Sequence, residues 1–435
     1  MPSNADDVAH LLRRSGFHAP AARVAQLAQL DWPAAVEAVL DTTANPADDM
    51  PAAWDTIAAT GTEISAQFTG LTQWWLNRCA TTPTPIVERM VHFWHGHFVV
   101  AFSKIYNVPA LVSLHRLYRS AGLGKLAPIT QAMAIEPAML SYLDNNTNVK
   151  GAPNLNFARE LLELFLLGVD NYTEADVLAA ARAWTGHSFT TTDRSRYVFN
   201  ASRHDVDPKT FFGKTANWNG PDIVTEVLTN ATSRPIVARY FATKLWQFFA
   251  HQQPAAATID KVAADFLAAD LEIKAALRSI FLHPDFVSPT VKQGLVRSPI
   301  DWVVACLAAT GLPAEVAHPE YTLASMGQQP FNPPNVSGWR HNGYWVNTSA
   351  YNGRSLFAAG CGAQLQTRGY WSDLASLSAA DAVARAEATF GVTFSATTRA
   401  GLSSWFSTQK VSSGNASLRT NFITLVMLSP EMQVS

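Results

Sequence analysis

The densest group of side chains able to do chemistry lies in residues 88–98, with the sequence ERMVHFWHGHF. On a helix, Glu88, His92 and His95 are four and three residues apart and therefore share one face. Imidazoles and a carboxylate on one face are suitable ligands for a divalent transition metal. The segment therefore predicts a metal site made by Glu88, His92 and His95, with two alternatives: His95 acts as a catalytic residue, or the histidines are structural.

A second polar group is formed by Asn156, Arg159, Glu160 and Glu163. A helical wheel at 100° per residue places all four in one sector of about 100°. Leu and Phe cover the rest of this helix, so it is expected to be buried, with its polar stripe facing solvent or a polar cavity. Glu160 and Glu163 are catalytic candidates, and Asn156 and Arg159 are substrate-binding candidates. The alternative is an exposed ion pair between Arg159 and Glu163.

The elements that must position these groups are mostly helices. Helical periodicity covers most of the chain, and strand patterns are limited to Arg196–Phe199 and Tyr344–Val346. The sequence therefore predicts a mainly α fold, a compact multi-helical array with two long ordered loops and at most short β hairpins. A capping box at Thr173 and Asp176 is expected to start one helix.

Residues 186–222 and 327–354 form the two long loops, and both are rich in aromatic residues. Long loops inside a compact domain tend to be functional or disordered, and their aromatic content disfavours disorder. We therefore expect substrate binding by His204, Asn335 and Trp339, and a catalytic role for Asp205. Lys244, in an otherwise apolar helix, needs a carboxylate partner if buried, and Glu160 or Glu163 is a candidate.

Composition excludes several classes of protein. The chain has 435 residues, a net charge of −2 and 15% charged residues, so no surplus of positive charge is available for coating nucleic acid. Hydrophobic residues reach 48%, which excludes wholesale disorder. The concentration of polar chemistry in the centre favours one integrated unit, with N-terminal helices in 1–85, a motif-bearing centre in 86–250 and C-terminal helices in 251–435.

The location is also predicted from sequence. Three widely spaced cysteines, Cys79, Cys306 and Cys361, indicate neither a disulfide framework nor a cysteine zinc site. The N-terminal residues lack the pattern of a secretory leader, and no apolar stretch is long enough to span a bilayer. We expect a cytoplasmic protein without membrane insertion, or an exported one if a leader has been removed.

Taken in order, these segments resemble the bacterial domain of unknown function 1800 family. The resemblance extends over almost the whole chain and is carried by FWHGHF, PNLNFARELLELFLLGV, YTEADVLAAARAWTG, FFGK, ARYFATKLWQFF and PFNPPNVSGW. It implies no settled activity, and it implies a partner protein similar to alkaline phosphatases and sulfatases. The sequence departs from the family pattern at Gly96, Leu155, His187 and 340–343, where an asparagine, a glutamate, a tryptophan and a glycine pair are usual.

The leading functional hypothesis is a hydrolase or transferase acting on a small molecule or a glycan. An imidazole or carboxylate acts as general base, Arg159 holds an anionic or carbonyl group, and the loop tryptophans cover the substrate. Carbohydrate is preferred because Trp and Tyr offer flat apolar faces and paired carboxylates suit glycoside chemistry. A glycoside mechanism requires two of Asp144, Glu160, Glu163 and Asp205 within about 10 Å across a shared cleft.

Two other functions stay open. One is a metal-dependent enzyme with histidine ligands, in which the divalent metal is the cofactor. The other is a non-catalytic protein that binds a glycan or assembles with another protein.

Overall fold

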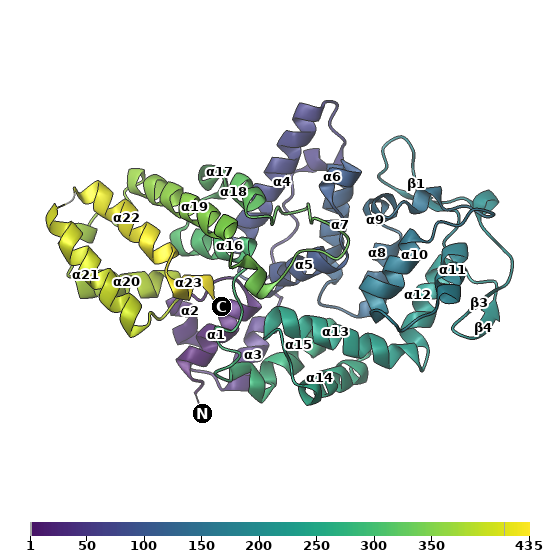
Figure 1. Ribbon diagram of the computed structural model, residues 1–435, viewed down its shortest axis with the longest axis horizontal. Coiled ribbons are helices and arrows are strands. Elements are labelled where there is room, and N and C mark those ends of the chain that lie inside the picture. Colours follow the sequence, from purple (N-terminus) through teal and green to yellow (C-terminus); the bar gives the residue numbers. More distant parts are fainter. Residues whose placement is uncertain (1, 413) are drawn as a thin grey trace.

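The computed structural model describes residues 2–412 and 414–435 (Figure 1). Helices dominate these residues, and the β structure is limited to two small antiparallel hairpins, so the predicted mainly α fold is confirmed. From the N-terminus to residue 142 the helices are α1 (Ala5–Ser15), α2 (Ala21–Leu27), α3 (Trp32–Leu40), α4 (Gly61–Thr81), α5 (Pro85–His97), α6 (Phe102–Ile105), α7 (Val108–Ala121), α8 (Leu126–Ala134) and α9 (Pro137–Tyr142).

The remaining helices follow in two groups. Those of the centre are α10 (Asn156–Glu160), α11 (Glu174–Ala183), α12 (Gly220–Thr229), α13 (Ser233–Phe249), α14 (Ala256–Ala268), α15 (Ile273–Leu282) and α16 (Pro299–Thr310). Those of the C-terminal part are α17 (Ala314–Ala317), α18 (Pro319–Ser325), α19 (Thr348–Thr367), α20 (Ala379–Phe390), α21 (Ala396–Ser412), α22 (Asn415–Met427) and α23 (Pro430–Gln433). No described helix is both long and apolar enough to cross a membrane.

Both hairpins lie in the first predicted loop. β1 (His187–Phe189) pairs with β2 (Tyr197–Phe199), and β3 (Lys209–Phe211) pairs with β4 (Lys214–Ala216). The strand predicted at Arg196–Phe199 is therefore present. The strand predicted at Tyr344–Val346 is wrong, because Asn342–Trp345 forms a short 3₁₀ helix. The second predicted loop is also shorter than expected, since α19 begins at Thr348.

Local sequence explains where the helices around the site begin. α5 starts with Pro85 at its first position, where the missing N–H costs nothing. α16 starts after Ser298, whose hydroxyl accepts a hydrogen bond from the Asp301 N–H. The capping box predicted at α11 is confirmed, because Thr173 and Asp176 each accept a bond from the other's backbone N–H.

The helix that carries the predicted polar stripe is not a single α-helix. α10 ends at Glu160, and Leu161–Leu167 form a π-helix that is followed by Gly168. A π-helix has i→i+5 hydrogen bonds, so its side chains no longer follow the 3.6-residue period of the wheel. The predicted sector of four polar residues is therefore distorted beyond Glu160.

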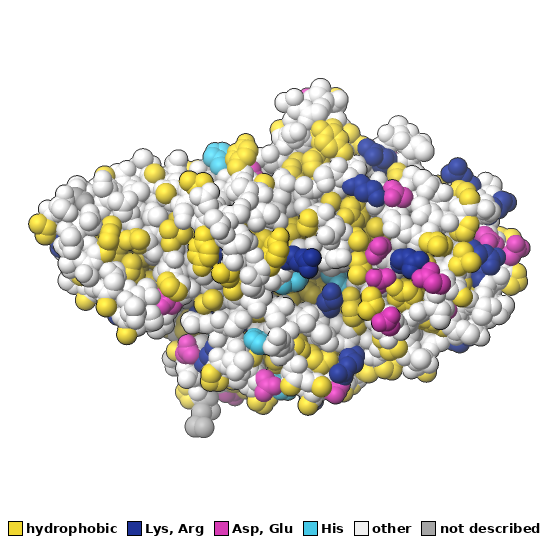
Figure 2. All heavy atoms as spheres, viewed as in Figure 1, with side chains coloured by type: hydrophobic (Ala, Val, Ile, Leu, Met, Phe, Trp, Pro, Cys, Tyr) yellow, Lys and Arg dark blue, Asp and Glu magenta, His cyan; other side chains and the backbone are white. Residues whose placement is uncertain are grey.

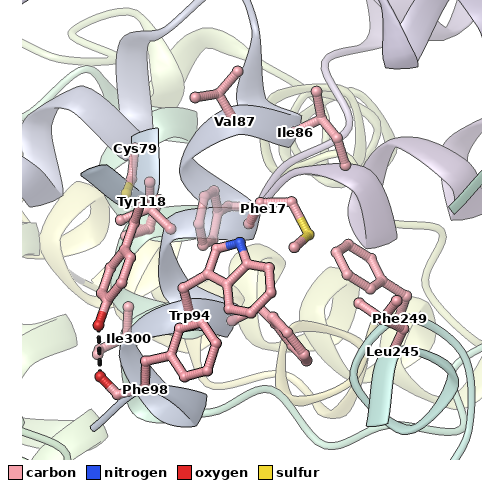
Figure 3. Packing of buried hydrophobic residues seen from close by; sticks show 14 of the residues in the cluster. Phe17, Cys79, Ile86, Val87, Trp94, Phe98, Tyr118, Leu245, Phe249 and Ile300 are labelled. Carbon is pink, nitrogen blue, oxygen red and sulfur yellow. Dashed lines mark hydrogen bonds between the residues drawn. The ribbon is translucent and has the colours of Figure 1, made fainter. Parts of the chain in front are cut away.

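The hydrophobic core holds α5 in the middle of the molecule. Figure 3 shows Trp94 packed among Phe17, Phe98 and Phe249, and its ring stacks on Phe98 with centroids 4.8 Å apart. The Trp94 indole N–H donates to the Gly122 carbonyl at 2.9 Å. Burying an indole removes about 200 Å² from water, which stabilises the fold by about 5 kcal/mol at most. Trp94 thus anchors α5 in the core.

Figure 1 shows how the other elements lie around α5. Helices α8–α12 and both hairpins form the right-hand part, and α19–α22 form the left-hand part. α13, α14 and α15 pack against one another below α5. The chain between α18 and α19 passes close to α5, since the Phe331 N–H donates to His95 Nε2 at 2.6 Å. This passage brings the second predicted loop to the histidine segment.

Candidate functional site

The main candidate site is a cavity of about 100 Å³, called the central cavity below. It lies between α5, α13, the first turn of α16 and residues 328–345. A cavity of this size holds several water molecules or one small polar group. Figure 2 shows Lys, Arg and His side chains around a hollow near the middle of the molecule. The polar and aromatic lining includes Arg89, His92, His97, Lys244, Gln247, Ser298, Asp301, Gln328, Trp339, His341 and Trp345.

Asp301 is the only carboxylate side chain that lines the central cavity among the described residues. Its side chain is 14% exposed and forms an ion pair with Arg89. Burial alone would raise the pKa of Asp301, but the charge of Arg89, together with the contacts of Asp301 with His92 and Arg89, outweighs burial and holds that pKa well below its usual range. Asp301 is therefore an anion at neutral pH.

His92 lies next to this carboxylate. Its Nδ1 atom is 3.3 Å from Asp301 Oδ1, a contact without full hydrogen-bond geometry. Its Nε2 atom has no hydrogen-bond partner within the described chain. The ring is held edge-on against Phe248 and Trp339, with centroids 5.6 and 6.2 Å away. A carboxylate behind one nitrogen favours hydrogen on Nδ1 and leaves Nε2 able to accept a proton.

The other two histidines of α5 have structural bonds. The Phe331 N–H donates to His95 Nε2 at 2.6 Å, which fixes the second predicted loop on α5. His97 Nε2 donates to the Phe165 carbonyl at 2.9 Å, and its ring lines the central cavity. Burial is the main cause that lowers the pKa of each to about 3. Both are neutral at pH 7, and His95, the predicted catalytic histidine, does not line the cavity.

Lys244 lines the same cavity and is half-buried. Its Nζ atom lies 5.3 Å from the centre of the Tyr240 ring, and the described residues offer it no ion pair or hydrogen bond. Burial lowers its pKa. The expected carboxylate partner is therefore absent from this part of the structure. Since Arg89 and Asp301 neutralise each other, the positive charge of Lys244 is left over and favours an anionic ligand.

Two indoles of the cavity also lack partners. Trp339 and Trp345 are 4% and 2% exposed. Neither Nε1–H has a hydrogen-bond partner in the described structure. An unsatisfied buried donor costs about 1–3 kcal/mol. Acceptor groups of a ligand or of bound water would remove this cost. Trp339, the predicted substrate-binding residue, does line the cavity, but as a buried wall.

The predicted metal site is not assembled. Glu88 is fully buried and accepts hydrogen bonds from Trp75 Nε1 (3.1 Å), Arg78 Nε (3.2 Å) and Arg119 Nε and Nη2 (2.7 and 2.9 Å). No group of three or more His, Cys, Asp or Glu residues within the described ranges is arranged to hold a metal. Glu88 is therefore a buried counter-ion shared by Arg78 and Arg119, although helix spacing places it on the same face as His92 and His95.

The predicted polar stripe makes contacts along its own part of the fold. Asn156 donates to the Leu143 carbonyl at 3.2 Å. Arg159 forms two bonds with Glu174, at 2.6 and 2.8 Å, rather than pairing with Glu163. Glu163 instead accepts a bond from the Tyr172 hydroxyl. Glu160 is half-buried, and burial followed by the charge of Glu163 raises its pKa. None of the four lines the central cavity.

The remaining predicted residues lie in turns and ion pairs. Asp205 binds Arg182, with oxygen–nitrogen distances of 2.6 and 3.2 Å. His204 Nδ1 lies 2.8 Å from the Thr185 carbonyl. Asn335 accepts a bond from the Ser337 N–H at 3.0 Å and holds a turn. Each of these polar groups already has a partner within the described chain, and none of the three lines the central cavity.

The expected carboxylate pair does not meet in the central cavity. Asp144 pairs with Lys104 at 2.7 Å, and Glu160 and Glu163 lie on the same turn of one helical segment rather than on two walls. None of Asp144, Glu160, Glu163 and Asp205 lines the central cavity. A two-carboxylate glycoside mechanism therefore lacks a site there.

Sequence reasoning missed Asp301 and Arg89. The motif Ser298-Pro-Ile-Asp301 is typical of a helix start, with Ser298 as the N-cap and Asp301 three residues later. Capping therefore explains Asp301 in the sequence, and nothing in the motif indicates a second role for it. The available signal was that Asp301 is the one acidic residue of an otherwise apolar helix, PIDWVVACLAAT. A carboxylate in such a helix needs a cation nearby.

Comparison with known proteins assigns the chain to one protein family. The model of a family described as "protein of unknown function (DUF1800)" matches residues 10–434. Comparisons with curated proteins and with solved structures gave no match.

Proposed function

We propose, from the premise that the chain belongs to the DUF1800 family, that it is a hydrolase or transferase acting on an anionic substrate in the central cavity. The observation that carries the proposal is the contact between His92 and Asp301 in the wall of that cavity. A histidine backed by a carboxylate is a common general base, and the carboxylate stabilises the imidazolium that forms.

In the proposed reaction, His92 Nε2 takes a proton from water or from a substrate hydroxyl. Asp301 keeps the ring oriented and compensates its new positive charge. The 3.3 Å contact shortens when that charge develops, as catalytic contacts commonly do in the bound state. Lys244 then binds an anionic oxygen of the substrate or the negative charge that develops on it.

The size and charge of the cavity support this class of substrate. About 100 Å³ admits a carboxylate, phosphate or sulfate group rather than a whole sugar ring. Trp339 and Trp345 present no exposed flat face on which a sugar could stack, since they are at most 4% exposed. Carbohydrate is therefore less well supported at this cavity than a small anionic group.

The test is an activity screen of the full chain with chromogenic carboxylic, phosphate and sulfate esters and glycosides. We expect turnover of an anionic ester, and a loss of about 10²–10⁴-fold in kcat for His92→Gln. Lys244→Met should raise KM, because it removes the cation that binds the substrate. His318→Gln is the matched control, because the His318 side chain is 60% exposed and outside the cavity.

Two results would contradict the proposal. One is that no substrate of the screen is turned over by protein that unfolds cooperatively. The other is that folded His92→Gln keeps the full rate. Binding of an anionic ester without turnover would instead identify a binding protein at the same cavity.

A further inference from the structure

A second cavity, called the hairpin cavity below, lies at the first predicted loop. It has a volume of about 350 Å³ and is formed by η2 (Asn145–Thr147), β1, the turn after β1, and β2. It shares no lining residue with the central cavity. Its volume lies within the range of small-molecule sites, about 300–1,000 Å³. It is therefore a separate candidate site.

The side chains around the hairpin cavity are mainly neutral and polar. Those of Asn146, Ser188, Thr191, Thr192 and Arg203 line it, and none forms a hydrogen bond or ion pair within the described chain. In contrast, the neighbouring amide of Asn148 is fully used, since it donates to the Ala181 carbonyl and accepts from the Asn154 N–H, both at 2.9 Å. The cavity thus presents hydroxyl, amide and guanidinium groups that are free to bind a ligand.

His187 adds a buried ring nitrogen that lacks a hydrogen-bond partner in the described structure. It lines the hairpin cavity and is 3% exposed. Its Nδ1 atom lies 2.8 Å from the Tyr197 hydroxyl, while Nε2 has no partner in the described structure. Burial and then the charge of His204 lower the pKa of His187 to about 3, so the ring is neutral at pH 7. One ring nitrogen is therefore left without the hydrogen bond that buried polar atoms normally make.

We infer that the hairpin cavity binds a pyranose sugar through its hydroxyl groups. Sugar hydroxyls both donate and accept hydrogen bonds, which matches the Ser, Thr and Asn side chains and His187 Nε2. Arg203 offers parallel N–H groups to two neighbouring sugar oxygens. The lining contains no carboxylate and only one cation, so the cavity matches a neutral polyol better than a highly charged anion. Val198 and Phe189 supply the apolar contact for the ring.

The test is calorimetric titration of the full chain with methyl glucoside, N-acetylglucosamine and glucuronate, and separately with inorganic phosphate. We expect one of the sugars to bind, and Asn146→Ala to weaken that binding on the order of tenfold, because one to two hydrogen bonds are lost. Asn146 is half-buried and its side chain has no internal partner, so this variant should fold. His187→Phe should have a larger effect, and its melting temperature reports whether it folds.

Two controls separate this inference from its alternatives. Thr215→Ala, on exposed β4, should leave the affinity for the sugar unchanged. His92→Gln should also leave it unchanged, because the inference does not depend on the central cavity. Absence of sugar binding, binding of phosphate alone, or unchanged affinity in Asn146→Ala would each overturn it.

Discussion

Replacing Glu88 by Gln should destabilise the protein strongly, because this residue is a buried counter-ion. Its carboxylate is completely shielded from water and faces only donors: the Trp75 indole and the guanidinium groups of Arg78 and Arg119. Gln has almost the same shape, so the substitution removes the negative charge and one acceptor atom without opening a cavity.

The magnitude follows from the individual contacts. Glu88 Oε1 accepts from Arg78 Nε and Arg119 Nε, and Oε2 accepts from Trp75 Nε1 and Arg119 Nη2. Whichever way the Gln amide is turned, its NH₂ group points at two other donors. Two buried donors then lose their acceptor at about 1–3 kcal/mol each. The Arg119 guanidinium loses its counter-charge, and Arg78 keeps only its ion pair with Asp49. Breaking a buried ion pair costs about 3–5 kcal/mol, which we expect for Glu88→Gln.

The assay is urea unfolding followed by tryptophan fluorescence and circular dichroism, with and without a chelator. Glu174→Gln is the matched control, because it removes the exposed Arg159–Glu174 pair and should leave the free energy of unfolding almost unchanged. A loss below about 1 kcal/mol for Glu88→Gln would refute the reasoning. So would a chelator that destabilises the wild type but not Glu88→Gln, since Glu88 would then be a metal ligand.

Three further substitutions test other parts of the structure. Burial raises the pKa of Glu136 to about 7, although the hydrogen bond donated by Ser113 opposes the shift, so the wild type loses stability as pH rises from about 4.5 through 7. In urea unfolding at pH 8, Glu136→Gln should therefore be more stable than the wild type by up to roughly 3 kcal/mol. In the same assay, Gly338→Ala should lower the free energy of unfolding by about 2 kcal/mol or more, because at φ +80° the new Cβ would lie 2.4 Å from the Gly96 carbonyl oxygen. Gly96→Ala is the control: its Cβ meets nothing closer than 3.9 Å, so it should be nearly neutral. Thr173→Ala removes the cap of α11 and should lower the free energy of unfolding by about 1 kcal/mol.

Local signals in the sequence were sufficient for most of the helices. α11 and α16 have a capping residue at one end and an apolar period between their ends, and such signals depend on fewer than twenty neighbouring residues. The π-helix at Leu161–Leu167 could not be foreseen in this way. Leu and Phe occupy nearly every position there. With almost no polar residue to mark one face, the hydrophobic pattern cannot distinguish a π-helix from an α-helix.

The site was harder to predict because its contacts are distant in sequence. His92 was recognised from its spacing, but the carboxylate beside it is Asp301, and the Arg89–Asp301 pair joins residues 212 positions apart. Glu88 was assigned to a metal by helix spacing alone. The structure gives its partners as Arg78 of α4 and Arg119 of α7, and no local pattern specifies which helices pack against α5. Helix spacing therefore identifies a shared face but not what that face contacts.

Partnering distinguishes structural from functional polar groups better than residue type does. With 15% charged residues, this chain has few charges to place in a large apolar interior. Glu88, His95 and Asp205 all looked catalytic or metal-binding by type, yet each has partners within the fold that account for its position. Lys244 and the indoles of Trp339 and Trp345 lack such partners. The indoles of Trp184 and Trp246 also lack partners among the described residues but line neither cavity. A missing partner therefore supports a ligand site only where it coincides with a cavity, since a ligand there could complete the bonds.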